Sequence, residues 1–181
     1  MPPPKSGRMA DVPDFLTLAR NRDRESSRDL VVRRTLVALI TILVLLGLAN
    51  AFGQRPSTSR ATTSVAELEV YAPARVRAGL YYMARFTIRA HAEIENATLV
   101  LDPGWAEGLT INTIAPSPVG EASDDGRIVF ELGHVPAGQK HVFFLHLQVN
   151  PTNIGRRGQD VELRDGDRTL TSIDRTITVF P

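Results

Sequence analysis

Four histidines, His91, His134, His141 and His146, are the side chains that could bind a metal ion or transfer a proton near neutral pH. His141 and His146 lie five positions apart in one expected strand, so they point to opposite faces and cannot share a metal or form a dyad. His91 and Glu93 share a polar face, which is ordinary for the wet side of a sheet. We therefore expect no metal centre and no catalytic pair.

The acidic turns and the known catalytic motifs lead to the same expectation. Asp124-Asp125-Gly126 and Asp165-Gly166-Asp167 lack the ligand spacing of a calcium loop, and Asp-Gly is common in turns. The sequence contains no Gly-x-Ser-x-Gly, His-Glu-x-x-His or phosphate-binding glycine loop. It has no cysteine, so disulfide and thiolate chemistry are excluded. These features predict a protein that is not an enzyme, has no cofactor and has no evident small-molecule substrate.

The segment from Thr35 to Phe52 is predicted to be a transmembrane helix. It contains eighteen residues and no charge, which is just long enough for a bilayer core. Its leucine, isoleucine, valine and phenylalanine side chains favour insertion by roughly 3 to 6 kcal/mol. The expected membrane-anchor residues are Arg33, Arg34, Leu36, Leu43, Leu46 and Phe52. Gly47 and Ala51 form a small-xxx-small pair that could contact another helix.

Arginines flanking this segment predict its orientation. Six arginines lie between residues 20 and 34, whereas only Arg55 and Arg60 follow within a similar distance. Because positive charge is retained in the cytoplasm, we expect a cytoplasmic N-terminus and an extracytoplasmic C-terminal domain. The net charge is +1, and the basic excess lies beside the membrane, so we expect no nucleic-acid binding.

A signal peptide is the alternative interpretation. Ala49-Asn50-Ala51 matches the small-x-small pattern of a cleavage site, and cleavage after Ala51 would release the outer domain. The segment before the apolar run is thirty-four residues long and contains five acidic side chains, which favours an uncleaved anchor.

The remaining chain divides by composition. Residues 1–13 are expected to be disordered, residues 14–34 to form a cytoplasmic juxtamembrane helix, residues 35–52 to span the membrane and residues 53–63 to form a linker. Residues 64–181 are expected to form one domain that is large enough to bury its own core.

Period-two alternation dominates this domain. It is clearest from Leu80 to Ala92, and further short strands follow, separated by glycine, proline and aspartate turns. His141–Val149 is apolar on both faces and is expected to be the central strand. Val161 and Leu163, the Asp165-Gly166-Asp167 turn and residues 170–180 are expected to complete a terminal hairpin. Seven or eight strands with no confident helix predict an all-β, immunoglobulin-like antiparallel β-sandwich. Trp105 lies outside the strand pattern, so it is not assigned to the core.

Several segments carry a resemblance to a known family: Ala97-Thr98-Leu99-Val100-Leu101-Asp102-Pro103, then Gly126–Phe130, then Leu132-Gly133-His134-Val135-Pro136-Ala137-Gly138 before an apolar strand. Over residues 66–181 the chain resembles the Ig-like conserved-repeat and CARDB-type domains of bacterial surface proteins. The resemblance implies a spacer or adhesion fold, although this chain has one copy on a short stem instead of a long array. The expected partners are the lipid bilayer and another membrane or envelope protein.

Overall fold

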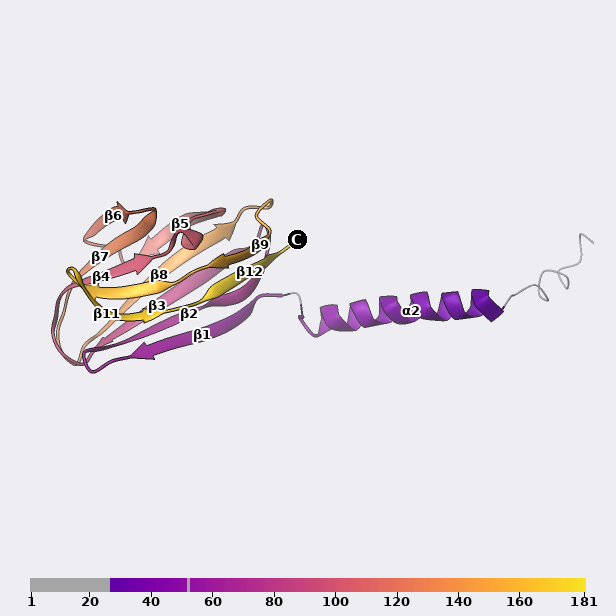
Figure 1. Ribbon diagram of the computed structural model, residues 1–181, viewed down its shortest axis with the longest axis horizontal. Helices are drawn as coiled ribbons and strands as arrows, with labels where there is room; N and C mark the ends of the chain where they lie inside the picture. Colours follow the sequence, from indigo (N-terminus) through magenta and orange to yellow (C-terminus); the bar gives the residue numbers. More distant parts are fainter. Residues whose placement is uncertain (1–26, 52) are drawn as a thin grey trace, which may run out of the picture. The chain divides into compact units, whose positions relative to one another are not determined.

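The computed structural model describes residues 27–51 and 53–181. The chain divides into two units, Met1–Ala49 and Asn50–Pro181. The first contains the helix α2, Ser27–Leu48, and the second contains all of the strands that the structure describes (Figure 1).

Helix α2 has the properties of a helix that lipid surrounds. Every residue from Arg28 to Leu48 is exposed, and this stretch of 21 residues is long and apolar enough to cross a membrane. Its two threonines satisfy their own hydroxyl groups: Thr35 donates to the Val31 carbonyl at 2.9 Å and Thr41 donates to the Val37 carbonyl at 2.8 Å. The hydroxyl groups of the two threonines therefore need no hydrogen bond from water. The same properties suit the apolar segment of a signal peptide.

The helix ends earlier than the sequence pattern predicted. Leu48 is its last residue, and Asn50 has φ +52°, a left-handed conformation that commonly ends helices. Ala51 therefore lies outside the helix, and the predicted helical pairing of Gly47 with Ala51 is wrong. Phe52 and the predicted features within residues 1–26 lie outside the described residues. The predicted boundary between a juxtamembrane helix and a transmembrane helix after Arg34 is absent, because α2 is continuous from Ser27.

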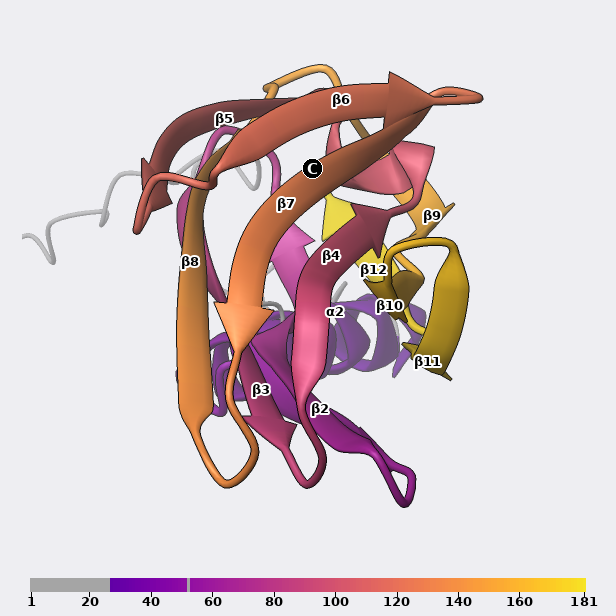
Figure 2. The same cartoon turned by 90° about the vertical axis from the view of Figure 1, so that its left-hand side faces the viewer.

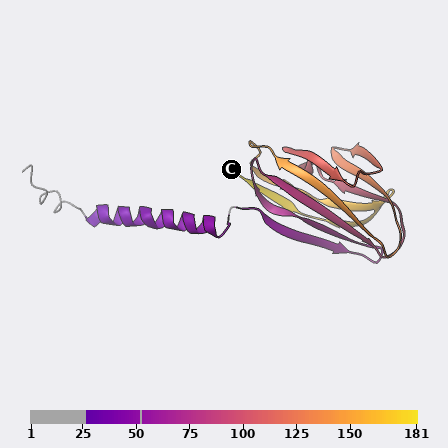
Figure 3. The same ribbon diagram turned by 180° about the vertical axis from the view of Figure 1, so that it is seen from behind.

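The predicted linker of residues 53–63 is wrong, because most of it is the strand β1, Arg55–Thr62. β1 pairs antiparallel with β2, Ala66–Arg77, from Arg55 opposite Arg75 to Thr62 opposite Glu67 (Figure 3). Arg60 forms an ion pair with Glu67 at 3.0 Å and another with Glu69. The segment is polar throughout and lacks apolar alternation, since it lies at the side of the sheet with much of its surface in solvent.

Two sheets pack face to face (Figures 1 and 2). The larger sheet has the strand order β5-β8-β3-β2-β12-β9, with β1 paired to β2. The smaller has the order β11-β10-β4-β7-β6. The remaining strands of the larger sheet are β3 Tyr81–Ala90, β5 Leu109–Ala115, β8 Lys140–Val149, β9 Gly155–Gly158 and β12 Thr176–Phe180. Those of the smaller sheet are β4 Ile94–Leu101, β6 Gly120–Asp124, β7 Arg127–Val135, β10 Val161–Asp165 and β11 Arg168–Ile173.

This architecture confirms the predicted all-β, immunoglobulin-like sandwich preceded by one apolar helix, with differences in detail. The described residues form twelve strands, where seven or eight were expected. The sandwich is not wholly antiparallel, because β12 runs parallel to β2. The predicted terminal hairpin is confirmed in part: β10 pairs antiparallel with β11 across the turn at Gly166 and Asp167. Its second strand ends at Ile173, however, and β12 crosses to the larger sheet.

The core follows the alternation that the sequence displayed. Tyr82, Ala84, Phe86 and Ile88 of β3 are buried, as expected for the inward face of that strand. β8 is not the central strand; it lies between β5 and β3, one strand from the sheet edge. Only one of its faces is fully buried, and the side chains of the other are half-buried or exposed.

Trp105 is a core residue, contrary to the sequence interpretation. It lies in the short 3₁₀ helix η2, Pro103–Trp105, and has no exposed surface. Its ring lies 5.2 Å from that of Phe86, and its Nε1 donates to the Asp160 carbonyl at 3.3 Å. Periodicity could not find it, because it enters the core from the β4–β5 connection.

Candidate binding site

The outer face of the smaller sheet carries a groove of about 450 Å³. Thr98 and Val100 of β4, with Val129 and Glu131 of β7, form its floor. Strand β6 and the residue before it form one wall, whereas β10 and the β10–β11 turn form the other. The wall residues are Val119, Ala122, Asp124, Arg164, Gly166 and Asp167.

The groove exists because the outer strands of the smaller sheet curve over the inner ones. Figure 2 shows β6 passing across the edge of this sheet, with β7 and β4 side by side below it. Val100 is 2% exposed although it is not part of the core between the sheets. It is buried on the outer face, which is unusual for a sheet surface that faces only solvent.

An ion-pair network joins the two walls. Arg164 of β10 contacts Glu162 through Nη2 at 2.5 Å and approaches Asp124 of β6 at 4.0 Å. Arg127 of β7 contacts Asp124 at 2.8 Å and Glu162 at 3.7 Å. Because β4 and β7 lie between β10 and β6, these pairs link the strands on the two sides of the groove.

The charge that remains in the groove is negative. The charges of Arg164 and Asp124 cancel, whereas Glu131 and Asp167 form no ion pair within the described part of the chain. The floor combines these acids with valine methyl groups. Such a surface suits an extended segment that carries lysine or arginine beside apolar side chains.

Sequence reasoning missed this site. Asn96, Thr98 and Val100 alternate with core residues, which predicts a wet outer face but not a hollow one. β6, with the sequence Gly120-Glu121-Ala122-Ser123-Asp124, has no apolar alternation and reads as a loop. The signal that could have found it is the closeness of β6 to β7, since Asp125-Gly126 is a two-residue hairpin turn.

The histidines do not converge. His141 is half-buried and His146 is exposed on the opposite face of β8, as predicted. Burial lowers the pKa of His141. Glu93 pairs at 2.9 Å with His134, an exposed contact, and not with His91. Among residues 27–51 and 53–181, no group of three His, Asp or Glu side chains could hold a metal ion.

A buried polar cluster lies inside the sandwich, apart from the groove. Gln159 donates to the Tyr82 hydroxyl at 3.2 Å and to the Gly104 carbonyl at 3.3 Å. Arg175 is 7% exposed, lies 5.1 Å from the centre of the Trp105 ring and donates to the Ala72 and Pro73 carbonyls at 3.3 and 3.4 Å. This cluster ties the β9–β10 and β11–β12 connections to the core.

Burial raises the pKa of Tyr82 to about 12, and this predicts a loss of stability at alkaline pH. The unfolded chain releases the phenol proton near pH 10, whereas the folded chain retains it, so stability falls from pH 10 toward pH 12. We expect a loss of about 2 kcal/mol at pH 11.5 from this group, measured by urea unfolding followed through tryptophan fluorescence. Tyr82→Phe should remove that part of the loss; an equally steep decline in Tyr82→Phe would contradict it.

Comparisons with known proteins give little beyond the fold. No protein-family model matches the chain, and no curated protein matches it. A cohesin module of a Clostridium perfringens family 33 glycoside hydrolase matches with TM-score 0.40 and 16% identity over 65% of this chain and 98% of that one. The alkylpurine DNA glycosylase AlkC of Pseudomonas fluorescens, bound to DNA, matches with TM-score 0.34 and 16% identity over 60% of this chain and 28% of that one. At these TM-scores neither protein assigns a function to this chain.

Proposed function

We propose that this chain is a single-pass membrane protein whose extracytoplasmic sandwich binds a basic, extended segment of another membrane or envelope protein. The role is non-enzymatic: the domain holds or stabilises its partner beside the membrane. The groove on the smaller sheet carries the proposal, because it combines recessed valine side chains with Glu131 and Asp167, two acids that form no ion pair in the part of the chain that the structure describes. Helix α2 supports the anchoring, since the apolar side chains that follow Arg34 are exposed and the helix is long and apolar enough to cross a membrane.

A crosslinking experiment tests the groove. A photo-crosslinking residue at Val119, which is 77% exposed at the rim, should capture the partner in intact membranes. Ala122→Trp fills the groove from β6 and should reduce this crosslink by at least about tenfold. Glu131→Lys should weaken it by reversing the charge. The matched controls are Ala92→Trp, on an exposed loop, and Glu121→Lys, on β6 but outside the groove; both should leave the crosslink unchanged.

Equal losses in the groove variants and in their controls would contradict the proposal. Repeating the experiment with α2 replaced by polyleucine separates the contribution of the helix to partner binding from that of the sandwich. If the partner is held through the groove, the polyleucine variant should retain the crosslink. A loss in that variant alone would assign recognition to the helix. Added protease should cleave the domain in whole cells and spare it in inverted vesicles, because the domain is proposed to be extracytoplasmic.

A secreted binding domain is the second candidate, and the end of α2 favours it. Ala49-Asn50-Ala51 directly follows the last helical residue, as the small-residue cleavage site of a signal peptide follows its apolar region. The mass of the mature chain decides between the two. A chain that retains residues 1–51 is anchored, whereas a chain that begins at Phe52 is released.

A further inference from the structure

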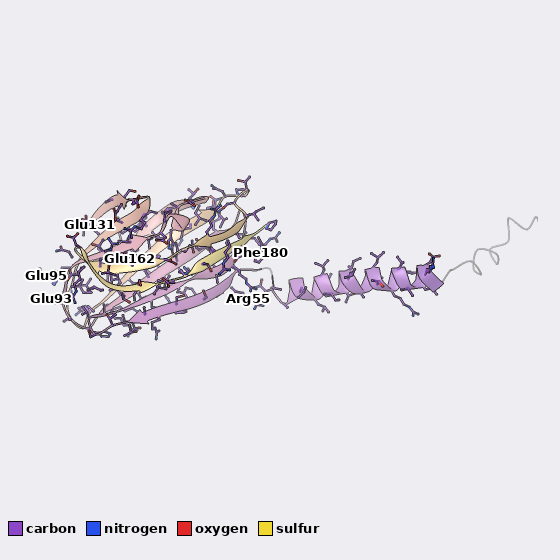
Figure 4. All side chains as sticks on the ribbon, viewed as in Figure 1. Arg55, Glu93, Glu95, Glu131, Glu162 and Phe180 are labelled. Atoms are coloured by element: carbon purple, nitrogen blue, oxygen red, sulfur yellow. The ribbon has the colours of Figure 1, made fainter. Side chains whose placement is uncertain are left out.

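One end of the sandwich carries exposed apolar and basic side chains that the groove does not use. Figure 4 labels Arg55 and Phe180 at this end, and Glu93 and Glu95 at the other. The strand registers bring its residues together: Arg75 lies opposite both Arg55 and Thr178, and Tyr81 lies opposite Gln148. We call it the arginine end and define it by Arg75, Arg77, Leu80, Tyr81, Ile154 and Arg156.

Large apolar side chains are concentrated there. Tyr81 is 63% exposed, Ile154 is 54% exposed and Leu80 is 42% exposed. Leu80 and Tyr81 follow the β2–β3 turn, and Ile154 lies in the β8–β9 connection, so they come from separate parts of the chain. Nothing in the sandwich requires these side chains to be apolar, because none of them enters its core.

Three exposed arginines lie beside these apolar side chains. Within the described residues, Arg75, Arg77 and Arg156 form no ion pair with an Asp or Glu side chain, although all three are exposed. Arg77 donates to the Pro181 carbonyl at 3.3 Å, and Arg156 donates to the Thr176 hydroxyl at 3.4 Å. The nearby carboxylate of Glu107 is matched by Arg157 at 3.5 Å. No Asp or Glu side chain of the described residues therefore offsets the positive charge of these three arginines.

Chain connectivity holds this end close to the anchor. Only six residues, Ala49 to Gln54, separate the last residue of α2 from the first residue of β1. Fully extended, such a connection spans at most about 25 Å. Gln54 donates from Nε2 to the Tyr81 carbonyl at 2.7 Å, so the chain enters the sandwich at the arginine end itself.

We propose that the arginine end docks on the anionic headgroup surface of the membrane that α2 spans. This inference rests on the anchoring part of the proposed function. Guanidinium groups bind lipid phosphates in a bidentate manner, and tyrosine with aliphatic side chains occupies the headgroup boundary. Each arginine near an anionic surface strengthens the contact roughly fivefold. Docking would hold the arginine end against the membrane and leave the opposite end, with Glu93 and Glu95, facing away from it.

The absence of cysteine allows a direct test with the full chain. Thr152→Cys, exposed in the β8–β9 connection, is labelled with an environment-sensitive fluorophore, and the protein is reconstituted in vesicles. With 30 mol% phosphatidylglycerol, which is roughly the content that gives a strongly anionic surface, we expect a blue-shifted emission and quenching by brominated lipids. In pure phosphatidylcholine both effects should shrink severalfold. The same label at Ala92→Cys, at the opposite end, should stay water-exposed in both vesicles.

Charge reversal provides the matched comparison. Replacing Arg75, Arg77 and Arg156 together with glutamate should abolish the lipid-dependent signal. Replacing Arg89, Lys140 and Arg168 with glutamate changes the net charge equally on exposed residues elsewhere and should preserve it. A Thr152 label that stays water-exposed in anionic vesicles, or equal signals in the two triple variants, would overturn the proposal. Vesicle flotation reports the anchoring separately: protein that floats without the signal contradicts docking, and protein that fails to float contradicts the anchor.

Discussion

Trp105→Ala should lower the free energy of unfolding by about 3–5 kcal/mol, the range for removing a large aromatic side chain from a core. Trp105 has no exposed surface and contacts Phe86 with ring centres 5.2 Å apart. Its removal also leaves the buried Arg175 guanidinium without the aromatic face that covers it. Both effects destabilise the same region, where the η2 connection meets the β11–β12 connection.

The measurement is urea unfolding followed by circular dichroism, because Trp105 is the sole tryptophan and its fluorescence is lost with it. Trp105→Phe should recover part of the stability by refilling some of the cavity. Ile154→Ala, at a side chain that is 54% exposed, is the control and should change stability by less than about 0.5 kcal/mol. If Trp105→Ala cost no more than Ile154→Ala, Trp105 would not be a core residue.

Trp105 also illustrates where sequence reasoning reaches its limit. The inward faces of β3 and β7 follow from period-two alternation, since each alternate side chain must enter the core. Trp105 and Arg175 enter the core from connections, where no period applies. Their burial depends on contacts between segments about seventy residues apart, which a local pattern does not record.

The same reasoning explains the error at residues 53–63. A strand at the side of a sheet, with ion pairs such as Arg60–Glu67 on its surface, needs no apolar alternation to be stable. Its hydrogen bonds to β2 supply the order that its side chains do not encode. This correction shortens the connection between α2 and the sandwich, on which the proposed docking of the arginine end depends.

The groove could be predicted only in part. Outward residues such as Thr98 and Glu131 are recognisable from the alternation, but the curvature that makes their face concave is not. The concave shape brings Asp124 of β6 to 4.0 Å from Arg164 of β10, although the two residues are forty positions apart. The sequence thus indicates which side chains face outward, whereas the hollow that they surround is a tertiary feature that no local pattern records.

The second large effect concerns Leu43, at the middle of the uncharged segment Thr35–Phe52. Leu43→Arg should move the protein out of the membrane fraction, because a central leucine favours insertion by roughly 0.3–0.6 kcal/mol and a central arginine opposes it by roughly 2.5–3.5 kcal/mol. The change of about 3–4 kcal/mol is comparable with the whole predicted insertion energy of roughly 3–6 kcal/mol. Leu43 is 60% exposed, so little packing within the described residues is lost with it. The expected result is a fall of at least about tenfold in carbonate-resistant protein.

Placing the arginine at two depths along the helix tests whether α2 spans a bilayer or only packs its apolar surface against a protein. Leu48, the last helical residue, is 79% exposed, and an arginine there can extend its side chain to the headgroups. Leu48→Arg should therefore leave most of the protein in the membrane, and Leu43→Phe should have no effect, since phenylalanine inserts about as favourably as leucine. A helix that only packs against a protein surface would respond to the face of the substitution and not to its depth. If Leu43→Arg and Leu48→Arg were extracted equally, α2 would not lie across a bilayer, and both the anchoring and the docking of the arginine end would fail with it.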